Sequence, residues 1–302
     1  MTPIPIIEIK NLSKSFGSLA AVTDLNLEVF RGDVFGFLGP NGAGKSTTIR
    51  MLLSLIKPTS GSILLFGKNL QDHRNDSVRK IGCIIEKPDF YLYLSAAKNL
   101  ELFSRLSGLL PAKSKIDEVL ELVGLKGRAH DNVKTFSHGM KQRLGIAQTL
   151  IHDPELIILD EPTTGVDAVS RREFWAMLKN LQKHEITILV STPYMDEANL
   201  CDKISLIQEG RIMASNSPRQ IIERFPKSIY GVYTRDKYLT LHVLQDLAIT
   251  DKIYPFGESL HWILKTDQAP SVPTQLQNII QRIEKIEPDI EDVFIDYMRN
   301  GK

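Results

Sequence analysis

Short apolar runs typical of strands alternate with stretches of helical periodicity along the first two thirds of the chain. Segments 6–12 and 25–30 alternate with period two, which predicts two early strands. Segment 34–56 begins as a short apolar strand, continues as a glycine-rich loop and ends as a periodic helix. The same criteria predict strands at 60–67, 81–86, 155–161, 186–192 and 203–210, and a helix at 170–183. This alternation is typical of an α/β core with a parallel sheet.

Two regions depart from that alternation. Residues 95–151 have the pattern of helices with polar joints, which predicts a helical subdomain at about 88–153 within a first domain of residues 1–217. Pro218 and Pro226 mark a change in composition, so residues 218–302 are predicted to form a small α+β domain. Its elements are expected in the order strand 228–234, helix 236–247, strand 251–256, strand 259–265, helix 271–283, a short extended piece and helix 290–300. That βαββαβ order is the ferredoxin-like pattern.

Composition and charge narrow the function classes. With 42% hydrophobic and 24% charged residues among 302, the chain is an ordinary globular protein rather than a disordered or collagen-like one. Because 37 Lys and Arg balance 36 Asp and Glu, there is no overall basic field to attract nucleic acid. The basic stretch 134–143 lacks interleaved aromatic residues, so nucleic acid is not expected as a partner.

Cysteines and apolar runs bear on the cellular setting. Cys83 and Cys201 lack the spacing of a metal site or a disulfide framework, and we expect both to be buried and chemically silent. The seven histidines form no metal-binding pair, so no metal beyond Mg²⁺ is implied. No secretory leader is recognisable, and no apolar run approaches the roughly 20 residues that cross a bilayer. The chain is expected to be soluble, or to meet a membrane only through a partner.

The glycine-rich loop carries the strongest chemical signal. Residues 39–47 read GPNGAGKST and contain the pattern G-x-x-x-x-G-K-[ST] between a strand and a helix. In such a loop, glycines let backbone N–H groups converge on an anion at a helix N-terminus, the lysine reaches the β- and γ-phosphates, and the hydroxyl after it binds Mg²⁺. A simple flexible turn is the weaker alternative. The residues expected to bind the nucleotide here are Gly39, Pro40, Asn41, Gly42, Ala43, Gly44, Lys45, Ser46 and Thr47.

Two further segments point to the same chemistry. The apolar run 156–159 ends in Asp160 and Glu161, at the strand end where ligands of α/β sheets gather. Asp160 is expected to hold Mg²⁺ and Glu161 to orient or deprotonate the attacking water, the alternative being two solvated acids. Ser137 and Gly139 lie at a helix start whose hydroxyl and N–H groups can face an anion, although a plain N-cap needs no function.

The segments GPNGAGKST, FSHGMKQR and LIILDEPTTGVD, together with Phe16, resemble the nucleotide-binding subunit of an ATP-binding cassette (ABC) transporter from residue 6 to about residue 217. The resemblance implies a P-loop ABC ATPase core with ATP and Mg²⁺ as cofactors. It also implies that Phe16 and Val22 lie near the adenine, that Ser137 and Gly139 contact ATP on a facing subunit, and that Asp167 belongs to the dimer-contacting loop.

The resemblance also implies partners. One cassette per chain implies a second ABC subunit, identical or paralogous, and a separate membrane-spanning permease, which would place the chain at the cytoplasmic face of the membrane. EPTTGVDAVSRREFW, STPYMDEA and IEDVFIDYM are most similar to the branch that serves drug, antibiotic or lipid exporters. The alternatives are a soluble ABC ATPase acting without a permease and, more distantly, a P-loop kinase or switch GTPase.

Three positions differ from the usual pattern of that family. Glu86 stands where a glutamine usually lies beside the metal, and a carboxylate can still ligate Mg²⁺. His138 replaces the first glycine of the signature LSGGQ. Pro193 replaces a histidine that would hydrogen-bond the γ-phosphate, and it has neither a side-chain donor nor an N–H. We therefore expect this site to bind nucleotide and to hydrolyse it slowly, unless the surrounding loop supplies another donor.

Aromatic residues cluster just after Glu86, at Phe90, Tyr91 and Tyr93. By its place in the family this segment is expected to be the socket for a coupling helix of the membrane subunit. The alternative is a core segment that needs no partner.

Overall fold

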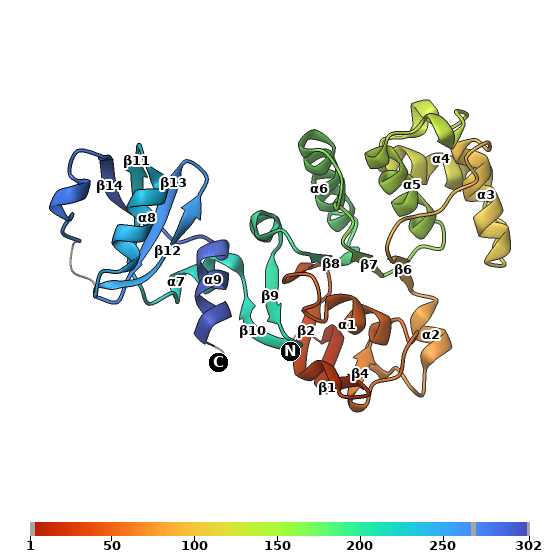
Figure 1. Cartoon of the computed structure of the whole chain (residues 1–302). Coiled ribbons are helices and arrows are strands. Elements are labelled where there is room, and N and C mark those ends of the chain that lie inside the picture. The colour runs from red at the N-terminus through yellow and green to blue at the C-terminus, as the bar shows by residue number, and fades with distance from the viewer. Residues whose placement is uncertain (1–3, 267–269, 301–302) are drawn as a thin grey trace. The chain divides into compact units, whose positions relative to one another are not determined.

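The computed structural model describes residues 4–266 and 270–300, which fold into two compact units, and the chain passes from the first to the second between Pro218 and Arg219 (Figure 1). The first unit is α/β, with parallel and antiparallel sheets and covering helices, as predicted. No helix in the described part of the chain is long and apolar enough to cross a membrane.

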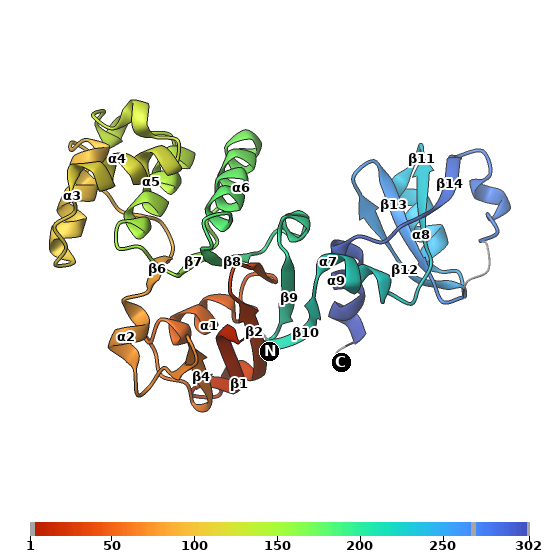
Figure 2. The same cartoon turned by 180° about the vertical axis from the view of Figure 1, so that it is seen from behind.

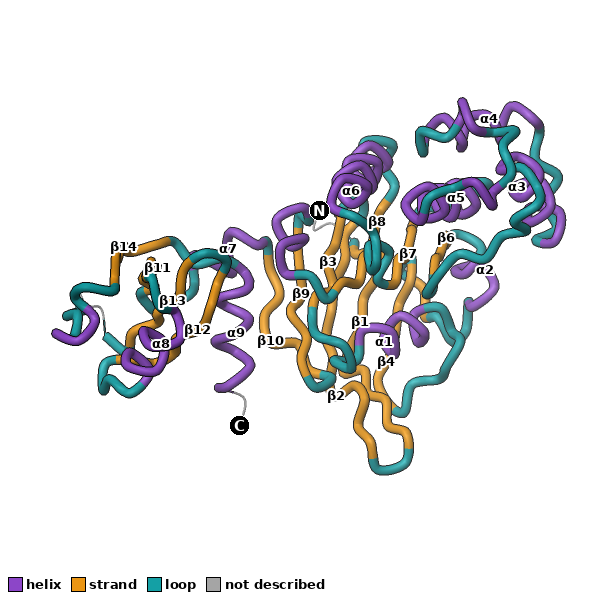
Figure 3. The backbone as a smooth tube through the Cα atoms, turned by 45° about the horizontal axis from the view of Figure 1, so that its top comes forward, coloured by secondary structure: helices purple, strands orange, loops and turns teal. Residues whose placement is uncertain are grey.

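The sheet that carries the chemistry is six-stranded in the order β10-β9-β3-β8-β7-β6 (Figure 3). Its neighbouring strands are parallel except for β10, which pairs antiparallel with β9. β3, β7 and β8 are buried along their whole length, as expected for a parallel sheet covered on both faces. The strands are β3 (Val34–Leu38), β6 (Ile81–Ile84), β7 (Leu156–Asp160), β8 (Thr187–Thr192), β9 (Lys203–Gln208) and β10 (Arg211–Asn216).

A second, antiparallel sheet has the order β2-β1-β4-β5 and comprises β1 (Pro5–Phe16), β2 (Leu19–Phe30), β4 (Ser60–Leu65) and β5 (Lys68–Asn69). β1 and β2 are longer than predicted, because irregularities in their register interrupt the alternation of apolar positions. At one of them Asn11 and Asp24 adopt positive φ angles of 48° and 49°, and the amide of Asn11 donates to the carboxylate of Asp24.

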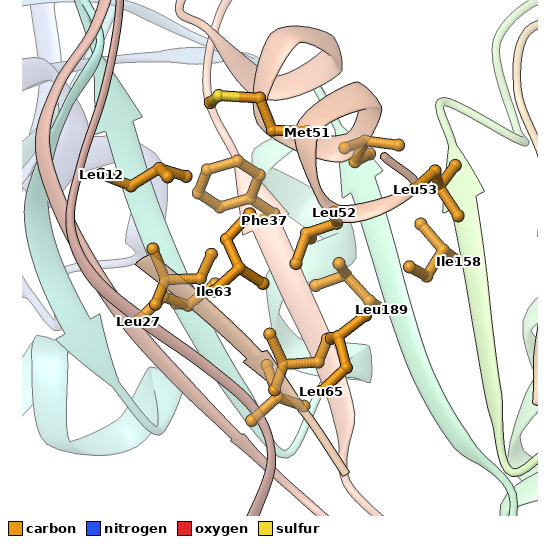
Figure 4. Packing of buried hydrophobic residues seen from close by; sticks show 14 of the residues in the cluster. Leu12, Leu27, Phe37, Met51, Leu52, Leu53, Ile63, Leu65, Ile158 and Leu189 are labelled. Atoms are coloured by element: carbon orange, nitrogen blue, oxygen red, sulfur yellow. The ribbon is translucent and has the colours of Figure 1, made fainter. Parts of the chain in front are cut away.

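The largest hydrophobic core lies between these sheets and around α1 (Lys45–Leu52). Phe37 of β3, Leu189 of β8 and Leu52 of α1 meet Leu27 and Ile63 of the antiparallel sheet in one interior (Figure 4). Because α1 is anchored there by its buried side chains, the loop that precedes it is held against a rigid layer.

The other helices of the first unit are α2 (Arg74–Val78), α3 (Ala96–Leu106), α4 (Lys113–Leu122), α5 (His138–Leu150) and α6 (Ala168–Gln182), with short 3₁₀ segments that include η3 (Met195–Leu200). α3, α4 and α5 pack on one another, as the helical pattern of residues 95–151 predicted, and α5 also packs on β6. Figure 2 shows this helical group from behind.

The cysteine prediction was half wrong. Cys201 is buried, and burial raises the pKa of its thiol. Cys83 is exposed, because β6 is the edge strand of its sheet and Cys83 is the residue of that strand whose side chain faces outward.

The second unit contains a four-stranded antiparallel sheet of order β12-β13-β11-β14. Its two central strands, β11 and β13, are the first and third of the four along the chain. Its elements are α7 (Pro218–Glu223), β11 (Ile229–Thr234), α8 (Lys237–Gln245), β12 (Thr250–Phe256), β13 (Ser259–Leu264), β14 (Ile280–Ile286) and α9 (Ile290–Asn300). The predicted helix 271–283 is wrong: a 3₁₀ turn at Thr274–Leu276 is followed by β14. The isoleucines of residues 280–286 are compatible with a helix or a strand, and pairing with β11 makes this segment a strand.

Candidate functional site

A cavity of about 740 Å³ opens where the carboxyl ends of the central strands meet α1. Ligands of α/β sheets usually bind at the carboxyl ends of the strands. The cavity brings together residues that the sequence places in six separate segments. The predicted site residues that line it are Phe16, Asn41, Gly42, Gly44, Lys45, Ser46, Thr47, Glu86, Asp160 and Glu161.

The loop between β3 and α1 is shaped by glycines. Gly44 has a φ of 104°, and a Cβ on it would lie 2.7 Å from the carbonyl oxygen of Ala21. A Cβ on Gly39 would lie 2.2 Å from the carbonyl oxygen of Ile207. These close approaches leave no room for side chains, so the loop backbone itself forms the cradle. Three residues that were predicted to bind nucleotide, Gly39, Pro40 and Ala43, do not line the cavity.

Lys45 is 3% exposed and links the loop to the carboxylate of Glu161. Its Nζ donates to the carbonyl oxygens of Gly39 at 2.8 Å and Pro40 at 3.1 Å, and lies 3.2 Å from Oε1 of Glu161. A buried ammonium group at a glycine-rich loop that leads into a helix suits a polyphosphate.

The end of β7 positions two acids with help from β8. Ser191 of β8 donates its hydroxyl to Oδ1 of Asp160 at 2.5 Å and accepts the backbone N–H of Glu161 at 3.0 Å. Glu161 has a φ of 48°, so the chain turns sharply there and aims the side chain into the cavity. Oxygen donors from Ser46 and Asp160 on the same cavity form a donor set that fits Mg²⁺.

Glu86 also lines the cavity, but its carboxylate is engaged. Oε1 of Glu86 lies 3.0 Å from Nη2 of Arg50, and the Glu86 side chain is 73% exposed. To ligate a metal, Glu86 must first leave Arg50.

Part of the cavity lining is apolar. Phe16 is half-exposed there, with the ammonium of Lys14 over its ring, and Leu19 and Ala20 complete a surface on which an aromatic base can stack. Val22 does not take part in this surface: it is 1% exposed and belongs to the core beneath Gly44. The residues of β2 that line the cavity are those just before Val22, so its predicted contact with a base is not seen in the cavity lining.

Ser137 and Gly139 do not line this cavity. Ser137 is exposed and caps α5 by accepting the N–H of Met140 at 3.2 Å, while Gly139 packs so closely on Ser170 of α6 that a Cβ would lie 2.8 Å from it. Asp167 caps α6, and hydrogen bonds from the N–H groups of Ser170 and Val169 lower the pKa of its carboxyl.

The end of β8 and the loop that follows it lie next to the glycine-rich loop. The carbonyl oxygen of Thr192 accepts the N–H of Gly39 at 3.2 Å, which ties the strand end to the phosphate cradle. Pro193 follows and offers no N–H. In the aromatic segment, Phe90 is buried against Phe103, whereas Tyr91 and Tyr93 are 55% and 78% exposed.

Several lining residues were missed by sequence reasoning: Leu19, Ala20, Ala21, Lys87, Gln142, Thr164 and Glu209. They come from strand, loop and helix positions that the fold alone brings to the cavity. Thr164 is the exception, because it follows Glu161 at a fixed spacing of three and its hydroxyl lies 3.4 Å from Oε2 of Glu161.

Comparisons with known proteins agree with this chemistry. Residues 22–164 match the family model described as ABC transporter. The chain is 48% identical over 210 residues to the bacitracin transport ATP-binding protein BcrA of Bacillus licheniformis, covering 69% of this chain and 68% of that protein. Identity to an uncharacterised ABC transporter ATP-binding protein, YhcH, of Bacillus subtilis is 45%, with the same coverage. A solved dimeric cassette, MJ0796, bound to ADP and Pi, matches 70% of this chain and 98% of its own with a TM-score of 0.61 and 25% identity.

Proposed function

This chain belongs to the ABC transporter family, and from that premise we propose that it is the ATP-binding and ATP-hydrolysing subunit of an exporter whose permease is a separate protein. The observation that carries the proposal is the cavity in which the glycine cradle, Lys45, Asp160 and Glu161 converge. The export direction rests on the similarity to a Nod factor export ATP-binding protein of Cupriavidus pinatubonensis, with 39% identity over 232 residues.

In the proposed reaction each residue has one task. The N–H groups of the cradle and the ammonium of Lys45 hold the phosphates of ATP, and Phe16 stacks on the base. Ser46 and Asp160 hold Mg²⁺, with Glu86 as a further ligand once it is released from Arg50. Mg²⁺ would supply neutralisation of the charge that develops on the phosphates. Glu161 leaves Lys45 and accepts the proton of the attacking water.

A second subunit completes the proposed site. Ser137 is exposed and lies outside the lining of this chain's own cavity, so we assign it and the N-terminus of α5 to ATP held by a facing subunit. Asp167, at the start of the neighbouring α6, is assigned to the contact between the subunits. Whether that subunit is identical or a paralogue follows from the experiment below.

The proposed membrane attachment uses the aromatic segment. Tyr91 and Tyr93 present exposed rings a few residues after the cavity residue Lys87, whereas Phe90 anchors the segment from within. We assign this surface to a helix of the permease, which places the chain at the cytoplasmic face of the membrane. Pull-down of the permease by the chain should fall after Tyr91→Asp, and undiminished pull-down would contradict the assignment.

Nucleotide-driven dimerisation tests the central proposal. Glu161→Gln should bind ATP without hydrolysing it and form a dimer that sedimentation detects with Mg²⁺ and ATP but not with ADP. Ser137→Arg in the same protein should abolish the dimer and leave ATP binding intact, whereas Ser107→Arg, at the exposed end of α3, should change neither. A protein that binds ATP and never dimerises alone points to a paralogous partner. Failure to bind ATP would refute the proposal.

Slow turnover is the second testable part. Pro193→His restores a donor at the end of β8, and a donor that acts in the transition state is worth about 10²–10³ in rate. We expect ATP turnover to rise at least tenfold, with little change in KM. Unchanged turnover would show that Pro193 does not limit the reaction.

A further inference from the structure

The cavity contains a buried polar group for which the proposed ATPase function has no role. Gln142 lies in the second turn of α5, lines the cavity and is only 2% exposed. No donor among the described residues reaches its side-chain Oε1. Buried amide oxygens are nearly always hydrogen-bonded, because the loss of water is otherwise uncompensated. This oxygen therefore points to a ligand or a water held in the cavity.

The packing of α5 locates Gln142 at the reacting end of the cavity. Gly145, one turn further along the helix, lies against Pro88, with 3.1 Å between an added Cβ and that ring. The preceding turn of α5 is thus next to the segment that carries Glu86. β6 and β7 are neighbouring parallel strands, so Glu86 and Glu161, which follow them, lie at adjacent strand ends. We therefore place Gln142 on the side of the cavity where Glu86 and Glu161 lie, which is the side of the terminal phosphate in the proposed function.

This end of the cavity needs a neutral donor. Ser191 gives its hydroxyl to Asp160, and Pro193 has neither an N–H nor a polar side chain. A side-chain amide carries two N–H donors and an acceptor on one rigid group. It can hold a phosphate oxygen with one atom and a water with the other, without changing its charge.

We propose that Gln142 is a catalytic residue of this chain's own ATP site. Its N–H donates to an oxygen of the terminal phosphate, and its Oε1 accepts a hydrogen bond from the attacking water, which orients that water for in-line attack. Gln142 neither gains nor loses a proton: the proton of the water goes to Glu161, and the bond that breaks joins the β- and γ-phosphates. The inference rests on the proposed ATPase function.

The test replaces the amide and keeps its shape. Gln142→Met has a similar length and no polar atoms to desolvate, so the unfolding midpoint of the nucleotide-free protein should stay equal or rise. The kcat for ATP should fall about 10²-fold, with KM within about threefold. Gln148→Met is the matched control, because Gln148 lies on the same helix and outside this cavity. It should leave kcat unchanged.

A double variant separates catalysis from structure. If Gln142 supplies the donor that Pro193 lacks, the Gln142→Met loss in kcat should shrink to less than tenfold in a Pro193→His background, since the two donors act on one phosphate. Unchanged kcat in Gln142→Met, or an equal loss in both backgrounds, would overturn the inference and leave the ATPase proposal standing. If the unsubstituted protein neither binds nor hydrolyses ATP, both the role of Gln142 and the proposed ATPase function are wrong.

Discussion

Removing the hydroxyl of Ser191 should destabilise the first unit more than an ordinary buried hydroxyl does. Ser191 is fully buried, and its hydrogen bond goes to the carboxylate of Asp160, which is 4% exposed. A hydrogen bond to a charged group contributes about 1.5–3 kcal/mol. The N–H of Glu161 keeps the carbonyl oxygen of Ser191 as an acceptor at 3.1 Å, so it adds little to the loss. We expect Ser191→Ala to cost about 2–3 kcal/mol.

The chain offers a matched control on a nearby strand. Ser205 of β9 is also fully buried, but its hydroxyl pairs with the neutral hydroxyl of Ser215 at 2.7 Å. Ser205→Ala should cost about 1 kcal/mol, because neither partner carries a charge. Urea unfolding followed by the fluorescence of Trp175 measures both, in a shared Trp262→Phe background that leaves a tryptophan only in the first unit.

The same variant has a functional readout. A group that orients a metal ligand typically affects metal affinity by 10–100-fold. The Mg²⁺ concentration for half-maximal ATP turnover should therefore rise at least tenfold in Ser191→Ala and stay constant in Ser205→Ala. Equal free-energy losses in the two variants, at equal dependence on urea, would refute the charge-assisted role of Ser191.

Two further predictions concern the cavity walls. Gly44→Ala should weaken ATP binding more than tenfold in a titration, because its Cβ would meet Ala21 at 2.7 Å, whereas Gly42→Ala faces open space and should lose less. Arg50→Met should leave stability within about 1 kcal/mol, since its pair with Glu86 is exposed, and should lower the Mg²⁺ requirement of turnover by freeing that carboxylate. A raised Mg²⁺ requirement would contradict the role of Glu86.

Local patterns account for the parts of the site that could be predicted from the sequence. The phosphate loop and the acids at 160–161 are contiguous segments whose spacing follows from the geometry of a strand that feeds a helix or ends at a sheet edge. Ser191 could not be assigned in this way. It reaches Asp160 because β8 lies beside β7, and that neighbourhood is set by strand order.

Two other features, the orientation of α5 and the strand β14, also depend on contacts that are distant in sequence. The pattern placed Gln142 on a helix, but only the packing of α5 on β6 decides which of its faces meets the cavity. In the second unit, isoleucines at 280, 283 and 286 have helical spacing, yet long-range pairing with β11 makes them a strand. In both cases partners distant in sequence decide between locally equivalent choices.

A buried ion pair in the second unit gives the last prediction. Lys252 and Asp296 are 6% and 7% exposed at their side chains, with 2.8 Å between Nζ and Oδ1, and they join β12 to α9. Breaking a buried pair usually costs about 3–5 kcal/mol, because a charge is left uncompensated. Lys252 would keep the carbonyl oxygens of Ile295 and Asp296, so we expect the lower end, about 3 kcal/mol, for Asp296→Asn.

The pH dependence of that loss follows from the pKa of Asp296. Burial acts to raise it, but hydrogen bonds from Lys227 and Lys252 outweigh burial and lower it below the unfolded value. The pair therefore contributes fully above about pH 4 and loses its contribution as the pH falls through the folded pKa. Unfolding followed by the fluorescence of Trp262, in a Trp175→Phe background, measures the loss in unfolding free energy at each pH. Asp251→Asn, which removes a partner of Lys227 that is 26% exposed at its side chain, should cost less than about 1 kcal/mol. Equal losses of unfolding free energy in Asp296→Asn and Asp251→Asn would contradict the role of burial. A loss in Asp296→Asn that does not become smaller below pH 4 would contradict the role of the Asp296 charge.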